Sequence, residues 1–538
     1  MRFPIMDIPT AIQTARTALG LELGSTRIKA VLIGPGCQPI ASGAYDWENR
    51  LENGLWTYRL EDVWTGVQAA YRALKEDAAQ KYGVTLTRLG ALGVSAMMHG
   101  YLPFGKEGRQ LASFRTWRNT VTEEEAALLT ERFQFNIPQR WSIAHLYRAI
   151  RLGEPHVKDL DYLTTLAGYV HWKLTGQKVM GVGEAAGMFP IDSASGGFHP
   201  KMLAQFDEIL KENGLGYTLE DVLPTVLPAG APAGELTPQG AKLLDPAGDL
   251  EPGVPFCPPE GDAGTGMTAT NSVAPRTGNV SAGTSIFAMV VLERPLSRVY
   301  PELDLVATPS GRPVAMVHCN TCTSDWDAWV KLFGQLLEKA GSPLAKPALY
   351  DLLYQEALAG PPDCGGVVSY NCYSGEPVVD LPAGRPLFFR QPELPFGLGA
   401  FLRAQLYAAM APLKTGMDLL LDREKAALDV LCGHGGLFKT PMVGQRLMAG
   451  ALGVPVSVAE TAGEGGPWGM ALLAMFRKEK APGEALEDWL NAKVFASAKT
   501  VTAQPQPEDR EGFARFHRRY LAGLPVERAA GELELEAE

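Results

Sequence analysis

The chain has 538 residues, of which 46% are apolar, 9% aromatic and 20% charged. This composition excludes a disordered or fibrous protein, and the length predicts two or more domains. A net charge of -11 argues against nucleic acid or an anionic membrane as the main partner. No apolar run approaches about 18 residues, and Arg2, Asp7 and Arg16 interrupt any secretory signal, so we expect a cytoplasmic protein.

The first strong pattern along the chain is a hairpin. Two apolar segments, 18–23 and 28–33, flank the small residues Gly24, Ser25 and Thr26 and predict two strands joined by a tight turn. A third extended segment is expected at 39–45.

A helix and a buried strand follow. Apolar residues recur at helical spacing over 63–74, and the apolar run 89–97 predicts a strand covered on both faces. This strand ends at His99, for which a structural role is the alternative to ligand binding. Strands that alternate with helices predict an α/β fold, in which ligands bind at strand ends.

The hairpin occurs twice. Residues 23–32 have a counterpart at 282–291, where Gly283, Thr284 and Ser285 form the turn. We therefore predict a duplicated fold with a cleft between its halves. The Pro- and Gly-rich segment 223–259 leads to a boundary near 271–277. The expected divisions are an N-terminal domain at 18–272, a C-terminal domain at 273–505, and a C-terminal extension with an acidic tail at 506–538.

The turns indicate phosphate chemistry. Glycine lets backbone N–H groups approach a phosphate, and Ser and Thr hydroxyls add donors, although glycine is also common in any tight hairpin. Two matched turns favour a polyphosphate held by both halves. Two further motifs carry polar groups, namely Asp262 in the Gly-rich segment 259–267 and the glycines of 433–436 after a predicted strand at 428–432. Asp262 is either a turn former or a general base, and the glycines of 433–436 either join a strand to a helix or admit an adenine ring.

The cysteines are sparse, as expected where thiols stay reduced. There are seven, and Cys319 and Cys322 form the single CxxC pair. Because no second pair completes a set of four ligands, we interpret these two as structural thiols, with a zinc site as the alternative.

In this order the motifs resemble those of the FGGY family of carbohydrate kinases, which belongs to a superfamily with heat-shock proteins and actin. The resemblance extends over nearly the whole chain. It implies two duplicated ribonuclease H-like (actin-like ATPase) domains with an interdomain cleft, the N-terminal one binding sugar and the C-terminal one nucleotide. The cofactors implied are ATP and Mg²⁺.

The resemblance also implies roles for individual residues. The first phosphate loop is similar at Gly24, Ser25, Thr26 and Lys29, the second at Gly283, Thr284 and Ser285, and the adenosine region at Gly435, Gly436 and Lys439. Asp262 matches the catalytic base and, with Glu22, would position Mg²⁺. Sugar-pocket candidates are Met98, His99, Trp117, Asn119 and Asp262. The segment 374–376 resembles a Ser-Gly-Glu turn of the family.

The chain departs from the family pattern at several positions. Glu22 stands where the family normally has Asp, and Arg118 and Asn119 stand where xylulokinase-like members have Asn and Asp. The segment 141–147 lacks the Lys and Trp of the family's signature there, and Leu437 replaces a glycine.

The resulting prediction is ATP-dependent phosphorylation of a sugar hydroxyl, with a ketopentose such as xylulose as the substrate. Alternatives are a kinase for another ketose or a polyol, a catalytically degenerate regulator that binds sugar or nucleotide, and an ATPase that drives a protein partner. The expected partner is a small-molecule sugar, with no nucleic acid and no membrane, and a homodimer is left open.

Overall fold

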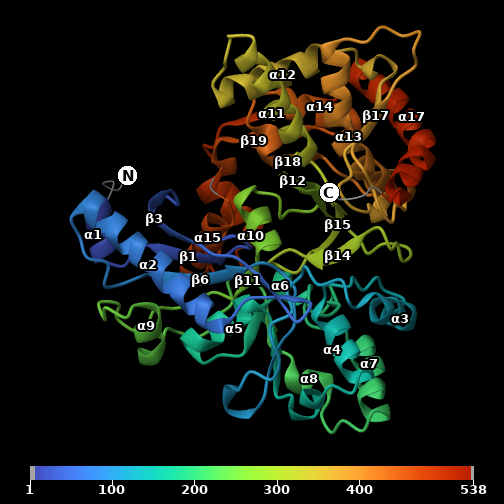
Figure 1. Cartoon of the computed structure of the whole chain (residues 1–538). Coiled ribbons are helices and arrows are strands. Elements are labelled where there is room, and N and C mark those ends of the chain that lie inside the picture. The colour runs from blue at the N-terminus through green and yellow to red at the C-terminus, as the bar shows by residue number, and fades with distance from the viewer. Residues whose placement is uncertain (1–6, 464, 535–538) are drawn as a thin grey trace. The chain divides into compact units, whose positions relative to one another are not determined.

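The computed structural model describes residues 7–463 and 465–534. The chain forms two compact units, each built from several segments (Figure 1). Among the described residues, the first unit contains 7–273, 305–314 and 465–497, and the second contains 274–304, 315–463 and 498–534. The chain first leaves the first unit after residue 273, and the division at 272 stays a prediction. The later return of 465–497 to that unit has no counterpart in the predicted domains.

The first unit is organised around a sheet of five strands in the order β11-β6-β1-β2-β3. β1 pairs in parallel with β6, which pairs in parallel with β11, whereas β2 is antiparallel to both β1 and β3. The predicted hairpin and the buried strand are therefore present. The bounds are β1 Ala18–Leu23, β2 Arg27–Ile33, β3 Pro39–Asp46, β6 Ala91–Ala96 and β11 Glu260–Gly261.

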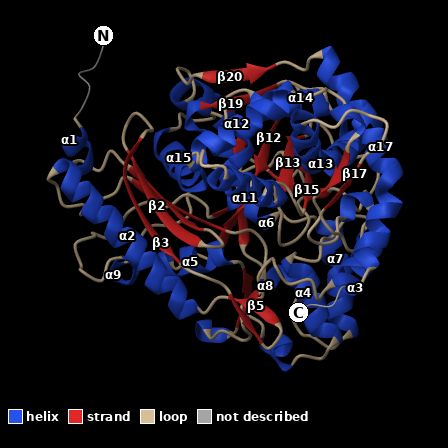
Figure 2. Ribbon diagram, turned by 45° about the horizontal axis from the view of Figure 1, so that its top comes forward, coloured by secondary structure: helices blue, strands red, loops and turns tan. Residues whose placement is uncertain are grey.

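Helices cover both faces of this sheet. α2 (Leu60–Tyr82) lies on one face and α15 (Gly465–Glu479) on the other (Figure 2). α15 approaches closely because Gly20 and Gly93, which are paired across β1 and β6, present no side chain. A Cβ atom on Gly20 would lie 2.0 Å from the carbonyl oxygen of Pro467 in α15. This close packing brings a helix from residues 465–479 against the first strand of the chain.

The rest of the first unit consists of shorter elements attached to this core. Its helices are α1 Ile8–Gln13, α3 Glu123–Phe133, α4 Ser142–Arg151, α5 Leu166–Thr175, α6 Val182–Ala185, α7 Pro200–Glu212, α8 Leu219–Val222, α9 Pro238–Leu244, α10 Asp262–Ala269 and α16 Leu486–Trp489. Its short strands are β4 Arg50–Glu52, β5 Leu55–Thr57, β7 Leu102–Phe104, β8 Tyr162–Thr164, β9 Val179–Gly181 and β10 Thr225–Leu227.

The second unit repeats the sheet. The order β15-β13-β12-β18-β19 corresponds strand by strand to β3-β2-β1-β6-β11, and β20 is added beyond β19. As in the first unit, the hairpin pair β12 and β13 is antiparallel and the pairs β12–β18 and β18–β19 are parallel. The duplication is therefore confirmed. The bounds are β12 Thr277–Ala282, β13 Ile286–Val291, β15 Pro313–Cys319, β18 Val430–Gly435, β19 Val456–Ala459 and β20 Thr500–Ala503, and β14 (Asp304–Ala307) has its residues 305–307 in the first unit.

Long helices fill the second unit. Nearly every residue of α13 is buried, and Arg403 on this helix donates to Asp509 of α17 over 2.6 Å with both side chains inaccessible to solvent. The predicted C-terminal extension is thus mostly α17, a helix of the second unit, while residues 535–538 of the predicted acidic tail lie outside the described residues. The elements are α11 Ser324–Lys339, α12 Lys346–Ala359, α13 Leu398–Asp418, α14 Val443–Leu452, α17 Pro507–Glu532, β16 Val368–Tyr370 and β17 Leu387–Phe389.

Two further features bear on the expectations from sequence. Across residues 7–463 and 465–534, none of the helices combines the length and the apolarity needed to cross a bilayer. Cys319 and Cys322 are both buried, free thiols in the second unit.

Candidate active site

The first predicted phosphate loop is the turn between β1 and β2. Its three carbonyl oxygens all accept hydrogen bonds from side chains or backbone behind the loop. Trp47 Nε1 donates to Gly24 O over 2.7 Å, the Tyr58 hydroxyl donates to Ser25 O over 2.6 Å, and Trp47 N donates to Thr26 O over 3.1 Å. The Trp47 and Tyr58 rings stack on each other with centroids 4.2 Å apart.

This arrangement decides which groups the loop offers to a ligand. Carbonyl oxygens repel anions, and here they are already occupied by donors. The Gly24 N–H donates to Arg27 O over 3.0 Å, so the groups that the loop presents are the amide N–H groups and the hydroxyls of Ser25 and Thr26, a donor set that suits an anion. Trp47 and Tyr58 were not among the residues predicted from sequence, since neither lies in the glycine motif.

Glu22 and Lys29 face each other on the two strands that lead into and out of this loop. They are directly opposed in the antiparallel register. Glu22 is buried and packs against α15, where a Cβ atom on Gly466 would lie 1.6 Å from Glu22 Oε2. Burial raises the pKa of Glu22 to about 7; Lys29 opposes the shift and the negative charge of Asp262 adds to it. The predicted pair of acids, Glu22 and Asp262, is thus electrostatically coupled within one unit.

Asp262 is the first residue of α10, directly after β11. Its Oδ1 accepts a hydrogen bond from the backbone N–H of Met98 over 3.2 Å. The residue is exposed, yet the protein around the carboxyl raises its pKa to about 6, an effect that hydrogen bonds from Met98 and Ala263 oppose. Asp262 is therefore open to a ligand and has a pKa suited to accepting a proton near neutral pH.

Met98 and His99 follow the end of β6, as predicted. His99 is buried, has a positive φ of 70°, and its Nδ1 lies 3.1 Å from the carbonyl oxygen of Gly187. Gly187 leaves room for the ring, because a Cβ atom there would lie 2.6 Å from His99 Nδ1. The backbone of Met98 thus contacts Asp262, and the His99 ring lies against the residues that follow α6.

The predicted sugar-pocket residues Trp117 and Asn119 differ in exposure and in how far their polar groups are already hydrogen-bonded. Trp117 is 39% exposed and its Nε1 donates to Ser25 Oγ over 3.2 Å, so this ring borders the first loop. The amide of Asn119 is buried and fully engaged: Nδ2 donates to Trp56 O over 2.9 Å, and Oδ1 accepts from Trp56 N over 2.9 Å. In this conformation Asn119 holds β5 in place and has little capacity left for a sugar hydroxyl.

Arg118 also makes contacts with nearby residues. Its guanidinium lies 4.0 Å from the centre of the Trp56 ring, and Nη1 donates to Asn49 Oδ1 over 3.1 Å. The substitution of the family's Asn by this arginine therefore adds a contact to the residues that precede α2.

Two buried carboxyl groups near Asp262 were missed from sequence. Glu260 accepts hydrogen bonds from the backbone N–H groups of Gly183 over 3.3 Å and of Glu184 over 3.0 Å, and burial raises its pKa to about 8. Glu184 is also buried, and burial raises its pKa well above the usual value, assisted by the charges of Asp262 and Glu260. A Cβ atom on Gly261 would meet Glu184 Oε2 at 2.4 Å. In the sequence, the signal for such a group was that Glu260 stands directly before Gly261 and Asp262.

In the second predicted phosphate loop, at Gly283, Thr284 and Ser285, carbonyl oxygens also accept hydrogen bonds from residues outside the loop. Thr323 donates to Gly283 O from both its backbone N, over 3.1 Å, and its Oγ1, over 2.8 Å, and Cys322 N donates to Thr284 O over 2.8 Å. The CxxC segment therefore supports this loop.

The remaining predicted nucleotide residues lie at the end of β18. Gly435 is paired with Ala282, the last residue of β12, and has a φ of 102° that favours glycine. Gly436 begins the short turn 436–438, and Lys439 follows it. The adenosine residues predicted from sequence thus adjoin the second phosphate loop within the second unit.

The predicted Ser-Gly-Glu turn lies in the same unit. Glu376 is buried and accepts from Asn320 N over 2.8 Å, while Asn320 Nδ2 donates to Gly375 O over 2.6 Å. The turn is thereby tied to the residues that follow β15.

Comparison with known proteins agrees with these features. Models of the FGGY family of carbohydrate kinases match residues 17–267 with the N-terminal domain and residues 278–477 with the C-terminal domain. The xylulose kinase of Escherichia coli (strain K12) is 23% identical over 287 residues, which cover 52% of this chain and 55% of that enzyme. The alignment thus spans about half the length of that relative.

Solved structures extend the comparison to the whole fold. The xylulose kinase from Rhodospirillum rubrum matches with a TM-score of 0.77 at 20% identity, covering 96% of this chain and 100% of that chain. Plasmodium falciparum glycerol kinase with ADP matches with a TM-score of 0.73 at 14% identity, covering 96% of this chain and 99% of that chain. These structures share the actin-like ATPase fold, and together with the two domain matches they show that the chain belongs to the FGGY family of carbohydrate kinases.

Proposed function

We propose that this protein transfers the terminal phosphoryl group of ATP to a hydroxyl group of a sugar. The observation that carries the proposal is Asp262, an exposed carboxyl with a pKa of about 6 at the N-terminus of α10, in the same unit as a loop that presents hydrogen-bond donors. A carboxylate with this pKa is mostly deprotonated at neutral pH and can accept a proton from an attacking hydroxyl.

The steps assigned to this chain's residues are positioning and proton transfer. Asp262 accepts the proton as the sugar oxygen attacks the terminal phosphorus. The first loop, at Gly24, Ser25 and Thr26, stabilises negative charge on the phosphates through the amides and hydroxyls of Ser25 and Thr26, since phosphoryl transfer depends mainly on alignment and electrostatics. The second loop and Gly435, Gly436 and Lys439 are proposed to bind the rest of the nucleotide.

Magnesium is the second proposed cofactor, and the donor chemistry fits it. Glu22 and Asp262 are hard oxygen donors whose mutual repulsion a cation would relieve. Among the described residues no group of three or more His, Cys, Asp or Glu side chains is arranged to hold a metal, so these two carboxylates would act with water and phosphate oxygens, as Mg²⁺ often does. When bound, the cation would neutralise phosphate charge.

A ketopentose such as xylulose is the proposed sugar. Its support is the Met98-His99-Gly100 motif beside Asp262 and the similarity to enzymes named xylulose kinase. The glycerol kinase among the structural neighbours keeps a polyol as the second candidate. A cytoplasmic location and a homodimer remain part of the proposal, and size-exclusion chromatography with light scattering would test the latter.

The test is ADP release with Mg-ATP against ketopentoses, ketohexoses, aldoses and polyols, with a control without sugar. We expect turnover with one ketopentose, and Asp262→Asn to lower kcat by about 10² to 10⁴ while ATP binding is kept. Asp488→Asn, an exposed acid in the first turn of α16, is the matched control and should leave kcat unchanged. ATP binding without turnover on any sugar would instead support the degenerate regulator.

A further inference from the structure

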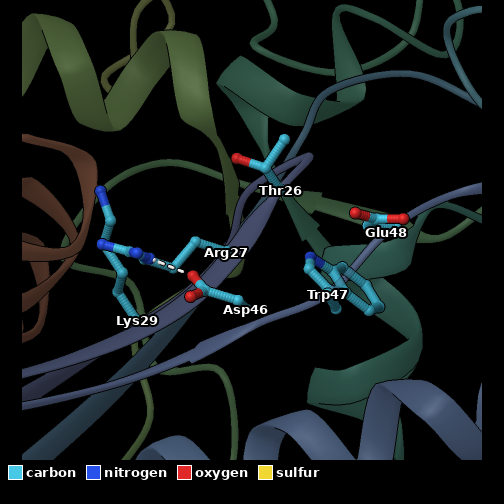
Figure 3. A pocket seen from close by; sticks show the side chains of 6 residues that line it. All are labelled: Thr26, Arg27, Lys29, Asp46, Trp47 and Glu48. Atoms are coloured by element: carbon cyan, nitrogen blue, oxygen red, sulfur yellow. Dashed lines mark hydrogen bonds and ion pairs between the residues drawn. The ribbon is translucent and has the colours of Figure 1, made fainter.

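A cavity of about 730 Å³ lies beside the first phosphate loop, within the first unit (Figure 3). Its lining includes two cationic side chains, those of Arg27 and Lys29. Lys29 belongs to the predicted phosphate loop, whereas Arg27 has no role assigned to it. The lining residues are Thr26, Arg27, Lys29, Asp46, Trp47 and Glu48.

Strand geometry puts both cations on the same side of the sheet as Glu22. Arg27 and Lys29 are two positions apart on β2, so their side chains leave the same face. Lys29 is directly opposed to Glu22 on β1, and Arg27 is directly opposed to Asp46 on β3. Figure 3 shows the Arg27 guanidinium turned toward the Lys29 side of the cavity, with Glu48 on the opposite side.

Arg27 is held by a partner that an anion could replace. Its Nε lies 2.5 Å from Asp46 Oδ1, but the two side chains are 52% and 73% exposed. Exposed ion pairs contribute little to stability, because water and salt screen both charges. The contact with Asp46 uses Nε, and a phosphate could instead pair two N–H groups of the guanidinium with two of its oxygens and carries more negative charge than a carboxylate.

We propose that Arg27 is a further phosphate ligand of the nucleotide site and that Asp46 holds its guanidinium ready in the absence of ligand. On binding, Arg27 leaves Asp46 and pairs with oxygens of the terminal phosphates at the edge of the first loop. The carbonyl oxygens of this loop do not oppose the phosphates, because they accept hydrogen bonds from Trp47 and Tyr58. The inference rests on the proposed use of ATP at this loop.

The test measures binding of ATP and of inorganic tripolyphosphate to the full chain by titration calorimetry. We expect Arg27→Gln to weaken tripolyphosphate binding about tenfold or more, the size of a lost charged hydrogen bond, and to make binding less sensitive to salt. Asp46→Asn should tighten binding, because the competing carboxylate is gone, and the double variant should resemble Arg27→Gln. Arg88→Gln breaks a comparable exposed pair with Glu251, at 2.6 Å, and should have no effect.

Several outcomes would overturn the proposal. Binding by Arg27→Gln within twofold of the parent protein would leave the Arg27–Asp46 pair as an ordinary surface ion pair. Weakening by Asp46→Asn equal to that by Arg27→Gln would mean that the pair only supports the loop. If the parent protein binds ATP but phosphorylates no sugar, the kinase proposal fails while the ratio of affinities still tests Arg27. If it binds neither ATP nor tripolyphosphate, both proposals fail.

Discussion

The chemistry of the site depends on how the protein shifts the pKa values of its carboxyl groups. Glu22 and Asp262 both have raised pKa values, of about 7 and about 6: burial is the main cause for Glu22, and partial removal of the carboxyl from water by the surrounding protein is the main cause for Asp262. Glu22 is enclosed against α15, whereas Asp262 stays exposed and receives a backbone hydrogen bond. One acid is thus suited to a fixed role beside a cation, and the other to accepting a proton.

The pKa of Asp262 predicts the pH dependence of the reaction. A general base acts only when deprotonated, so kcat/KM should fall as pH decreases through about 6 and level off above it. Measurement of kcat/KM between pH 5 and pH 8 at saturating Mg²⁺ checks this. A profile that is flat across this range would contradict the role given to Asp262.

At the level of secondary-structure elements, the two predicted phosphate loops are shaped by residues that hydrogen-bond to their carbonyl oxygens. In the first loop Trp47 and Tyr58 bind the carbonyls, and in the second Cys322 and Thr323 do so. The glycine motifs give the backbone its freedom, while residues from other elements decide which polar groups face outward.

Removal of one of these hydrogen bonds should affect nucleotide binding more than stability. Tyr58→Phe frees Ser25 O, and we expect the KM for ATP to rise about three- to tenfold, with a loss of about 1 kcal/mol of unfolding free energy. Tyr82→Phe is the matched control, because Tyr82 donates to Ile40 O over 3.0 Å away from the loop. It should cause a similar loss of stability with unchanged KM, and an equal KM change in both variants would exclude a specific role for Tyr58.

The close packing of α10 against α15 contributes to the stability of the first unit. Gly469 of α15 contacts α10 so closely that an added Cβ atom would lie 2.0 Å from Thr265 O. Gly469→Ala should therefore destabilise the protein by about 1 to 3 kcal/mol, as overpacking does.

Gly266 in α10 provides the comparison. No atom lies within 4 Å of a Cβ atom placed there. Gly266→Ala should stabilise the helix by about 0.5 to 1 kcal/mol, because alanine loses less conformational freedom. Urea unfolding of both variants measures the difference, and equal effects would show that the contact can relax.

At the scale of the whole molecule, the chain uses one topology twice. Both units have the same order of five sheet strands, and both carry a glycine turn at the same hairpin. The units differ in their additions. The first unit carries the buried acids beside Asp262, and the second carries the long buried helix α13 and its ion pair with α17.

The buried acids predict how global stability varies with pH. Glu260 titrates near pH 8 in the folded protein and near 4.5 as a free side chain, so the folded state holds the extra proton between these values. The free energy of unfolding should therefore fall as pH rises from about 4.5 to about 8. Glu260→Gln should flatten this dependence even if it lowers stability at every pH, and an unchanged slope in thermal unfolding would contradict it.

The local structure and the order of the motifs could be predicted from neighbouring residues in the sequence. The strands at 18–23 and 28–33, the duplicated hairpin at 282–291 and the acid at the start of α10 could be predicted, because apolar periodicity and glycine turns depend on neighbouring residues. These features also placed the chain in its family.

The tertiary structure shows how distant residues complete these motifs. Trp47, Tyr58 and Thr323 reach loop carbonyls from segments 20 or more residues away, and α15 returns to cover β1 after more than 400 residues. It also showed that Asn119 is occupied by backbone groups and that Asp46 holds Arg27. Sequence patterns record spacing along the chain, whereas hydrogen bonding and burial depend on which segments meet in space.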